Sequence, residues 1–310
     1  MKEKDLPLIL ISGNQSGDLD SMVCAYVKRE IEGNKRKTLS KVLCLFNFPK
    51  SEWPLRTEAT FLFEHFSLRL DDVLFSDDLE SLNLNKLSEE GLLNIILVDH
   101  NKPEKILLPY YKSIIEVIDH HKKSYEYDVD IPITIEKTGS CSTLIGEQFL
   151  KQSKKNINID LAGLLYTTIK IDVDHLTNNP QYDLYKDKEI LAKLFPYCQI
   201  SDLFVREINI RKYNTGHFSL HDHLVKDFKH WFYDEICYGI STIHLDIKDF
   251  LEITNNSKNI IQNFISERNL DILFMMHLTK EPILKRELTI IFNDTFFYRK
   301  KLIQLIEISN

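Results

Sequence analysis

The chain has 310 residues, of which 43% are hydrophobic and 27% are charged, and its formal net charge at pH 7 is −7. This length buries a sizeable core and accommodates two domains, and the composition is ordinary for a soluble globular protein. The negative charge argues against broad, non-specific nucleic-acid binding, although it leaves room for a local basic pocket.

Targeting signals are absent from the sequence pattern. No apolar run reaches the roughly 18 residues that a membrane span needs, and the N-terminus lacks a cleavable signal. The five cysteines are scattered and form no CxxC pair, which favours reduced thiols. These features predict a cytoplasmic protein that binds neither membranes nor nucleic acid.

The first half of the chain alternates short apolar runs with stretches long enough for helices. Strands are expected at residues 6–13, 41–46, 92–99 and 113–119. Apolar residues at helical spacing predict helices over 18–33, which would end at Gly33, and over 142–152 and 159–172. This alternation predicts an α/β fold with a parallel sheet that helices cover on both faces.

The second half predicts a smaller α/β domain with a mixed sheet. Residues 178–217 look mostly helical, and strands are expected at 235–247, 270–278 and 286–293. We therefore expect an N-terminal catalytic domain over 1–185, a helical linker over 186–215 and a substrate-binding domain over 216–310. The aromatic-rich stretch 230–238 is expected to lie in a core.

Acidic and imidazole groups follow three of the expected strands. In an open parallel sheet, ligands bind beyond the carboxyl ends of the strands, so these groups should converge on one edge. They are Asp18 and Asp20 after the first strand, Asp99 and His100 after the third, and Asp119, His120 and His121 after the fourth. Mixed carboxylate and imidazole groups suit Mn, Fe, Co, Mg or Zn.

Each cluster also has a simpler interpretation. Asp18 or Asp20 alone is as well explained by capping a helix N-terminus, and His100 alone by a hydrogen-bonded surface histidine. The triplet Asp119-His120-His121 is harder to explain in this way. Three adjacent groups that are costly to desolvate rarely follow an apolar strand without a metal or a catalytic task.

The triplet also carries a resemblance to a known family. The sequence resembles the DHH phosphoesterase superfamily, and within it the eukaryotic cytosolic exopolyphosphatase and prune branch, to which family II inorganic pyrophosphatases are related. The matching segments keep the family order over nearly the whole chain. They are GNQSGDLDS, PLRTEATF, VDHN, IDHH, TGSCSTLI, LLYTTIKIDVD, LVKDFKHW, GISTIHL, KREL and YRKK.

The resemblance implies a two-metal site, with Mg or Mn as the preferred ions and Co or Zn as further candidates. The residues that match metal-binding positions are Asp18, Asp20, Asp99, Asp119, His120 and Asp172. Asn14 is a further candidate metal ligand, because it stands where the pyrophosphatase relatives carry a metal-binding histidine, although an amide is a poorer ligand than imidazole. His121 matches a histidine beside the phosphate site, and Asp99, Asp119, His120 and His121 are the expected catalytic group.

Basic residues of the second half are candidates for substrate binding. Taken alone, they form solvated charge runs. By the resemblance, Lys229, Arg299 and Lys300 contact phosphate oxygens, with Lys226 and Lys301 as weaker candidates. An arginine grips phosphate with two parallel hydrogen bonds, whereas a lysine acts as a point charge.

Several segments keep open interpretations. Residues 137–149 could bind an anion at a helix N-terminus, or Ser140 or Ser142 could simply cap that helix. His217, His221 and His223 could form a rival metal cluster but more readily form a polar hinge. Cys141 has no evident histidine partner as a nucleophile, and Arg56 has no role that physical reasoning assigns.

The expected function is hydrolysis of the terminal phosphate of linear inorganic polyphosphate by an exopolyphosphatase that acts as a monomer or weak dimer. Alternatives are a prune-like enzyme that cleaves short polyphosphates or nucleotides, an inorganic pyrophosphatase, and a polyphosphate-binding protein without activity. The sequence contains no GxxxxGK[ST] loop, so P-loop chemistry is not supported.

Overall fold

The computed structural model describes residues 6–36, 39–128, 130–152, 156–174, 176–177, 183–254, 258–279 and 285–293. The chain divides into two compact units, residues 1–212 and 213–310. The expected domain limits at residues 185 and 216 stay a prediction. None of the described helices combines the length and the apolarity needed to cross a membrane.

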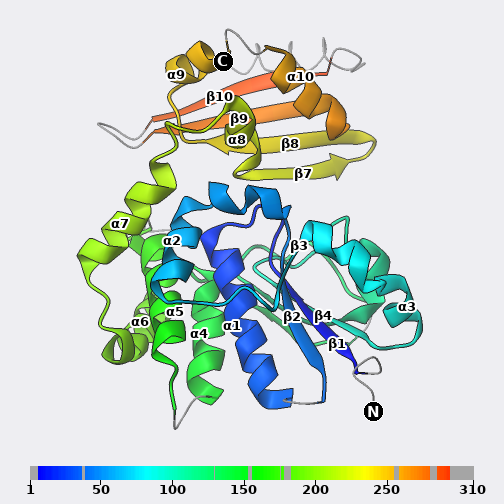
Figure 1. Cartoon of the computed structure of the whole chain (residues 1–310), viewed down its shortest axis with the longest axis vertical. Coiled ribbons are helices and arrows are strands. Elements are labelled where there is room, and N and C mark those ends of the chain that lie inside the picture. The colour runs from blue at the N-terminus through cyan, green and yellow to red at the C-terminus, as the bar shows by residue number, and fades with distance from the viewer. Residues whose placement is uncertain are drawn as a thin grey trace. The chain divides into compact units, whose positions relative to one another are not determined.

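A parallel sheet forms the centre of the first unit (Figure 1). Over the described residues it has six strands in the order β3-β2-β1-β4-β5-β6, and each neighbouring pair is parallel. The strands are β1 (Leu8–Ser12), β2 (Lys41–Phe46), β3 (Val73–Phe75), β4 (Leu93–Val98), β5 (Ile114–Asp119) and β6 (Ile133–Ile135). The expected parallel α/β fold is therefore confirmed.

The strand order places a switch point between β1 and β4. The chain leaves β1 towards β2 on one side, whereas β4 pairs with β1 on the other side and continues to β5. Connections that leave such a sheet in opposite directions open a crevice beyond the carboxyl ends of the two strands. Asp18 and Asp20 follow β1, and Asp99 follows β4, so they lie at this crevice.

Helices α1, α4 and α5 lie side by side over one face of the sheet (Figure 1). Ile9 and Ile11 of β1 point into the core on this face, and Leu8 and Leu10 point into a second core on the other face. The strand is apolar throughout because both of its faces are buried. The helices of the unit are α1 (Leu19–Arg36), α2 (Thr57–His65), α3 (Leu84–Glu89), α4 (Cys141–Gln152), α5 (Ile159–Asp174), α6 (Tyr185–Cys198) and α7 (Asp202–Tyr213). The 3₁₀ helices are Lys50–Leu55, Ser76–Leu82 and Leu108–Ser113.

Three details differ from the sequence-based expectation. Gly33 does not end the first helix, which continues to Arg36. The short edge strands β3 and β6 were not predicted, because three residues are too few to show a strand pattern. The expected linker region forms α6 and α7, whose Ile190 and Val205 pack into the core of the first unit.

A buried ion cluster joins α1 to its neighbours. Lys28 is fully buried and contacts Glu32 at 3.2 Å, Glu116 at 2.8 Å and Gln148 at 2.9 Å. Burial alone would raise the pKa of Glu32, but the Lys35 hydrogen bond and the Lys28 charge outweigh it and lower the pKa to about 2. An acid whose pKa falls on folding stabilises the fold above its unfolded pKa.

We expect Glu32→Gln to lower the free energy of unfolding at pH 7 by about 2 kcal/mol, because it removes a charge from a buried cluster. The stabilisation by Glu32 is lost as the pH falls from about 4.5 towards about 2. The difference between the two proteins should therefore shrink over this range in urea unfolding series. Glu89→Gln, at an exposed carboxylate, is the control. An equal difference at every pH would contradict the assignment.

The second unit contains a mixed sheet with the strand order β10-β9-β8-β7. Strands β7 and β8 pair antiparallel, β8 and β9 parallel, and β9 and β10 antiparallel. The strands are β7 (Phe228–Tyr233), β8 (Ile236–Ile243), β9 (Ile272–Thr279) and β10 (Lys285–Phe292). The helices are α8 (Leu220–Val225), α9 (Ile247–Thr254) and α10 (Lys258–Glu267). The smaller domain with a mixed sheet is confirmed.

The aromatic-rich stretch 230–238 was expected in a core, and this expectation is wrong for its first half. Trp231, Phe232 and Tyr233 are 38%, 59% and 70% exposed, whereas Cys237 is buried. In the described sheet β7 is an edge strand, and its last three residues are exposed.

Candidate metal centre

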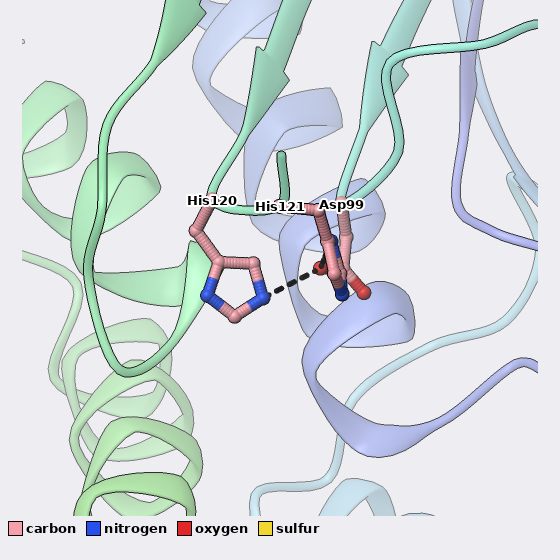
Figure 2. Close-up of side chains that lie close together, drawn as sticks. All are labelled: Asp99, His120 and His121. Atoms are coloured by element: carbon pink, nitrogen blue, oxygen red, sulfur yellow. Dashed lines mark ion pairs between the residues drawn. The ribbon is translucent and has the colours of Figure 1, made fainter. Parts of the chain in front are cut away.

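Three side chains from two neighbouring strand ends meet at the carboxyl edge of the sheet. Asp99 follows β4, and His120 and His121 follow β5, which ends at Asp119. One ligand atom from each of Asp99, His120 and His121 lies within 4.8 Å of the other two. Figure 2 shows His120 turned towards the Asp99 carboxylate, with 3.3 Å between Nε2 and Oδ1. This is the only such group of metal-ligating side chains among the described residues.

Asp99 occupies an unfavourable position for a carboxylate. Its backbone φ of 62° lies in the left-handed region, which turns the chain sharply after β4. The side chain is 2% exposed, and Oδ1 has no hydrogen-bond partner among the described residues. Burial, with the charges of Asp18 and Asp20, raises the pKa of Asp99 to about 7. Such a carboxylate would be stabilised by a cation.

His120 is the charge partner of these carboxylates. Its Nδ1 lies 3.1 Å from the Thr138 carbonyl oxygen, and Nε2 lies 3.9 Å from Asp20 Oδ2. Burial alone would lower the pKa of His120, but contacts with Asp99 and Asp20 outweigh it and raise the pKa to about 11. A backbone contact on one ring nitrogen leaves the other as a ligand atom, an arrangement common at metal sites.

Asp119 orients His121. The Asp119 Oδ1 atom lies 2.8 Å from His121 Nδ1 and accepts the backbone N–H groups of His120 and His121. Asp119 Oδ2 accepts a 2.5 Å hydrogen bond from Asn101 Nδ2. The hydrogen bond to Asp119 raises the pKa of His121, and the His121 side chain is 53% exposed. The His121 ring is therefore fixed by Asp119 on one side and accessible to a bound molecule on the other.

The turn between β1 and α1 shows what Asp18 and Asn14 contact. Asp18 does cap α1, because its Oδ1 accepts the Ser21 N–H at 3.0 Å, while its Oδ2 accepts hydrogen bonds from Ser16 and Asn14. The Asn14 amide donates from Nδ2 to Asp99 Oδ2 at 2.7 Å. The Asn14 Oδ1 atom accepts from Ser16 and Gly17 of its own turn.

Asn14 as a metal ligand stays a prediction, and in this structure its amide oxygen faces its own turn. Backbone donors engage its oxygen, so the amide presents N–H groups to the carboxylates, and a protonated amide nitrogen does not bind a cation. In this arrangement Asn14 links Asp18 to Asp99 and partly neutralises their repulsion.

Asp20 lies at the N-terminus of α4. Its carboxylate accepts hydrogen bonds from the backbone N–H groups of Cys141 and Ser142 and from the hydroxyls of Ser140 and Ser142, at 2.5–2.8 Å. The helix N-terminus expected to bind an anion thus binds the carboxylate of Asp20, an internal anion. Ser140 and Ser142 donate to Asp20 rather than capping α4 with their oxygens. Burial raises the pKa of the Cys141 thiol to about 11, which makes it a poor nucleophile.

Asp172, on α5, approaches the same cluster. Its Oδ2 atom is buried without a hydrogen-bond partner. Burial and the nearby Asp20 charge raise the pKa of Asp172 well above its ordinary value. Two buried carboxylate oxygens that accept no hydrogen bond from the described residues, on Asp99 and Asp172, fit a site that holds cations.

The structure describes some of the expected substrate-binding residues and not others. Arg299, Lys300 and Lys301 fall outside the described residues. Lys229 is in β7 and partly buried, whereas Lys226 is only 6% exposed and lies 5.5 Å from the centre of the Phe218 ring. His221 is exposed and His223 is buried, with its pKa lowered to about 4 by burial.

Sequence reasoning missed two supporting residues. Asn101 is buried and connects the loops after β4 and β5, because it donates to Asp119 and to the Lys122 carbonyl and accepts from Ser124. Arg56, which had no assigned role, donates to the Ser16 carbonyl. Both stood within segments that carried the family resemblance, and that was the available signal.

Comparisons with known proteins agree with this geometry. The DHH family, N-terminal domain, matches residues 8–169, and the DHHA2 domain matches residues 206–309. The first match covers the parallel sheet with the strand ends described above, and the second covers most of the second unit. The chain belongs to the DHH family, as the sequence segments predicted.

Curated relatives extend the similarity. Exopolyphosphatase PRUNE1 of Mus musculus is 27% identical over 273 residues, which cover 87% of this chain and 59% of that protein. The human protein of the same name is 25% identical over 88% of this chain and 60% of its own length. This chain thus spans about 60% of these relatives. A manganese-dependent inorganic pyrophosphatase of Methanocaldococcus jannaschii is 29% identical over 54% of this chain and 56% of that protein.

A solved structure shares the fold. It comes from Methanococcus jannaschii, is assigned to the family II inorganic pyrophosphatases, and superposes with a TM-score of 0.67. The match covers 94% of this chain and 89% of that chain at 21% sequence identity. This likeness concerns the architecture alone.

Proposed function

We propose that the protein is a divalent-metal-dependent hydrolase of phosphoanhydride bonds, and that it removes terminal phosphate from linear inorganic polyphosphate. The observation that carries the proposal is the Asp99 carboxylate, buried without a full set of partners between His120 and two further carboxylates. The similarity to proteins named exopolyphosphatase supports the choice of substrate.

The metal-binding residues we propose are Asp18, Asp20, Asp99, Asp119, His120 and Asp172. Their oxygen and imidazole donors suit Mn²⁺ or Mg²⁺, and the pyrophosphatase relatives named as manganese-dependent favour Mn²⁺. Two cations bound there would polarise phosphoryl oxygens, neutralise their charge and make a water more acidic. Most of the proposed metal-binding carboxylates are buried and fixed by hydrogen bonds. They would therefore hold the cations in place without rearranging during the reaction.

His121 is the proposed proton donor to the leaving phosphate oxygen. Its Nδ1 contacts Asp119, so Nε2 is the ring nitrogen that remains for proton transfer. The hydrogen bond to Asp119 raises the pKa of His121, which favours the protonated form that a general acid requires. Lys229, Arg299 and Lys300 are the proposed phosphate contacts of the second unit. Burial makes Lys226 a weaker candidate.

A second candidate is hydrolysis of pyrophosphate or another short phosphate chain. The similarity to a manganese-dependent inorganic pyrophosphatase over half of the chain favours it. For either reaction we propose a cytoplasmic protein that acts as a monomer or weak dimer. A phosphate-chain-binding protein without activity is the contrasting class.

The test is orthophosphate release from long-chain polyphosphate, tripolyphosphate, pyrophosphate and cyclic AMP, each with Mn²⁺, Mg²⁺ or Co²⁺. Release from the long chain, lost on addition of EDTA, would support the first proposal. Release from pyrophosphate alone would replace it with the second. Binding of polyphosphate without any release would identify a non-catalytic protein.

A further inference from the structure

Arg56 is an almost completely buried arginine beside the candidate metal centre. It lies between the 3₁₀ helix Lys50–Leu55 and α2, and it is 2% exposed. Its Nη1 group donates to the Glu52 carboxylate at 3.0 Å and to the Glu52 carbonyl at 3.2 Å. Its Nη2 group donates to the Ser16 carbonyl at 3.0 Å. One guanidinium therefore joins its own segment to the turn between β1 and α1.

Burying this cation is costly, and its contacts indicate what compensates the cost. Desolvated charges persist in folded proteins when they are paired and hydrogen-bonded. Glu52 neutralises the charge of Arg56. The Nη2 group donates to the Ser16 carbonyl of the turn. Only a planar guanidinium, with donors on both Nη atoms, can contact Glu52 and Ser16 at the same time.

The Phe48 ring contacts both the Arg56 side chain and the turn. The guanidinium carbon of Arg56 lies 4.0 Å from the centre of the Phe48 ring, within the range of a cation–π contact. Gly17, with φ of 55°, packs so closely on this ring that a Cβ atom there would lie 2.2 Å from it. Phe48 is held in turn by Phe46 and Phe75. The turn therefore has a rigid base.

The contacts of Ser16 lead from Arg56 to the carboxylates. The Ser16 hydroxyl donates to Asp18 Oδ2 at 2.8 Å, and the Ser16 N–H donates to Asn14 Oδ1 at 3.0 Å. Asn14 in turn donates to Asp99. A shift of the Ser16 carbonyl would move donors to two carboxylates of the cluster.

We propose that Arg56 is a positioning residue that fixes the β1–α1 turn and thereby holds Asp18, and through the Asn14 hydrogen bond also Asp99, in the geometry that binds a divalent cation. It acts through Ser16 and does not touch the ion. The inference rests on the metal-binding part of the proposed function and on no step of phosphate hydrolysis.

The test measures Mn²⁺ binding to metal-free protein by calorimetry, together with the rise in melting temperature on titration with MnCl₂. We expect Arg56→Met to weaken Mn²⁺ binding roughly 10- to 100-fold, the range for residues that orient metal ligands. Arg56→Lys keeps the charge but not the fork, so it should recover part of the affinity. Arg69→Met, at an exposed arginine that pairs with Asp71, is the matched control and should bind as the wild type.

A purely structural role would give a different result. Arg56→Met would then unfold at a lower temperature in EDTA, but its Mn²⁺ affinity would equal that of the wild type, and this would overturn the inference. If Arg56→Met does not fold, the Mn²⁺ affinity of Arg56→Lys is measured instead. An affinity equal to that of the wild type would then also overturn the inference. A wild type that binds no Mn²⁺ would also overturn it, whereas Mn²⁺ binding without phosphate release would count only against the proposed reaction.

Discussion

Asp99→Asn should nearly abolish phosphate release and, in the metal-free protein, increase the free energy of unfolding. We expect turnover to fall roughly 10³-fold or more, which corresponds to about 4 kcal/mol, because the substitution removes a central charged ligand. The gain in stability arises from the same change. Asparagine has nearly the shape of aspartate but does not bring a third negative charge next to Asp18 and Asp20.

The stability gain should depend on pH in a defined direction. Burial and the two neighbouring carboxylates raise the pKa of Asp99 to about 7 in the folded protein, from an ordinary value of 3.8. The folded state therefore holds this proton more tightly than the unfolded state, and ionisation destabilises the fold. The penalty is absent below pH 4, grows up to about pH 7 and is complete above it, with an upper limit of about 4 kcal/mol.

Urea unfolding of EDTA-treated proteins at pH 5 and pH 8 measures this effect. The advantage of Asp99→Asn over the wild type should be larger at pH 8, and saturating Mn²⁺ should reverse the order of stability, because only the wild type gains fully from the cation. Asp174→Asn, at an exposed carboxylate two residues beyond Asp172, should change neither quantity. A destabilised Asp99→Asn protein at pH 8 without metal, or one with unchanged turnover, would contradict the assignment.

The elements that could be predicted are those whose pattern is local. Strands β1, β4 and β5 are mainly apolar runs: Asp119 ends β5, Asp99 follows β4 directly, and Asp18 follows β1 after a short turn. The expected helices have regular apolar spacing. Their alternation predicted a parallel sheet, and a parallel sheet brings the ends of its strands together. The convergence of Asp99 with His120 and His121 follows from this topology, and the structure confirms that these three side chains meet.

The features that could not be predicted depend on contacts between distant segments. The sequence does not indicate which end of the Asn14 amide faces Asp99, because backbone donors in the folded turn decide it. It does not indicate that Asp20 fills the N-terminus of α4, 121 positions away in the chain. Arg56 had no local pattern either, since its partner Ser16 lies 40 positions earlier.

These contacts have one physical property in common. Each satisfies a charge or a polar group that folding has removed from water, and such groups need specific partners rather than a hydrophobic environment. A hydrophobic pattern predicts which side of a strand is buried, but not which donor meets which acceptor. Asn14 and Asn101 are examples, because each donates hydrogen bonds to carboxylates of the cluster that no hydrophobic pattern indicates.

His121→Gln should reduce the turnover number by roughly 10² to 10⁴, the contribution of a positioned general acid, and leave Mn²⁺ affinity nearly unchanged. The Asp119 hydrogen bond raises the pKa of His121, and the acid form is lost as the pH rises through that raised pKa. Wild-type turnover should therefore fall on the alkaline side, and this fall should disappear in the variant because glutamine does not titrate.

Turnover measured against pH at saturating substrate and Mn²⁺ gives both the loss of turnover and its pH dependence. The control is His221→Gln, at an exposed histidine of α8. If the variant kept the alkaline fall at full turnover, another group would donate the proton. If it lost turnover only through weaker Mn²⁺ binding, His121 would be a metal ligand, and since Asp119 contacts its Nδ1 atom, the ligand atom would then be Nε2.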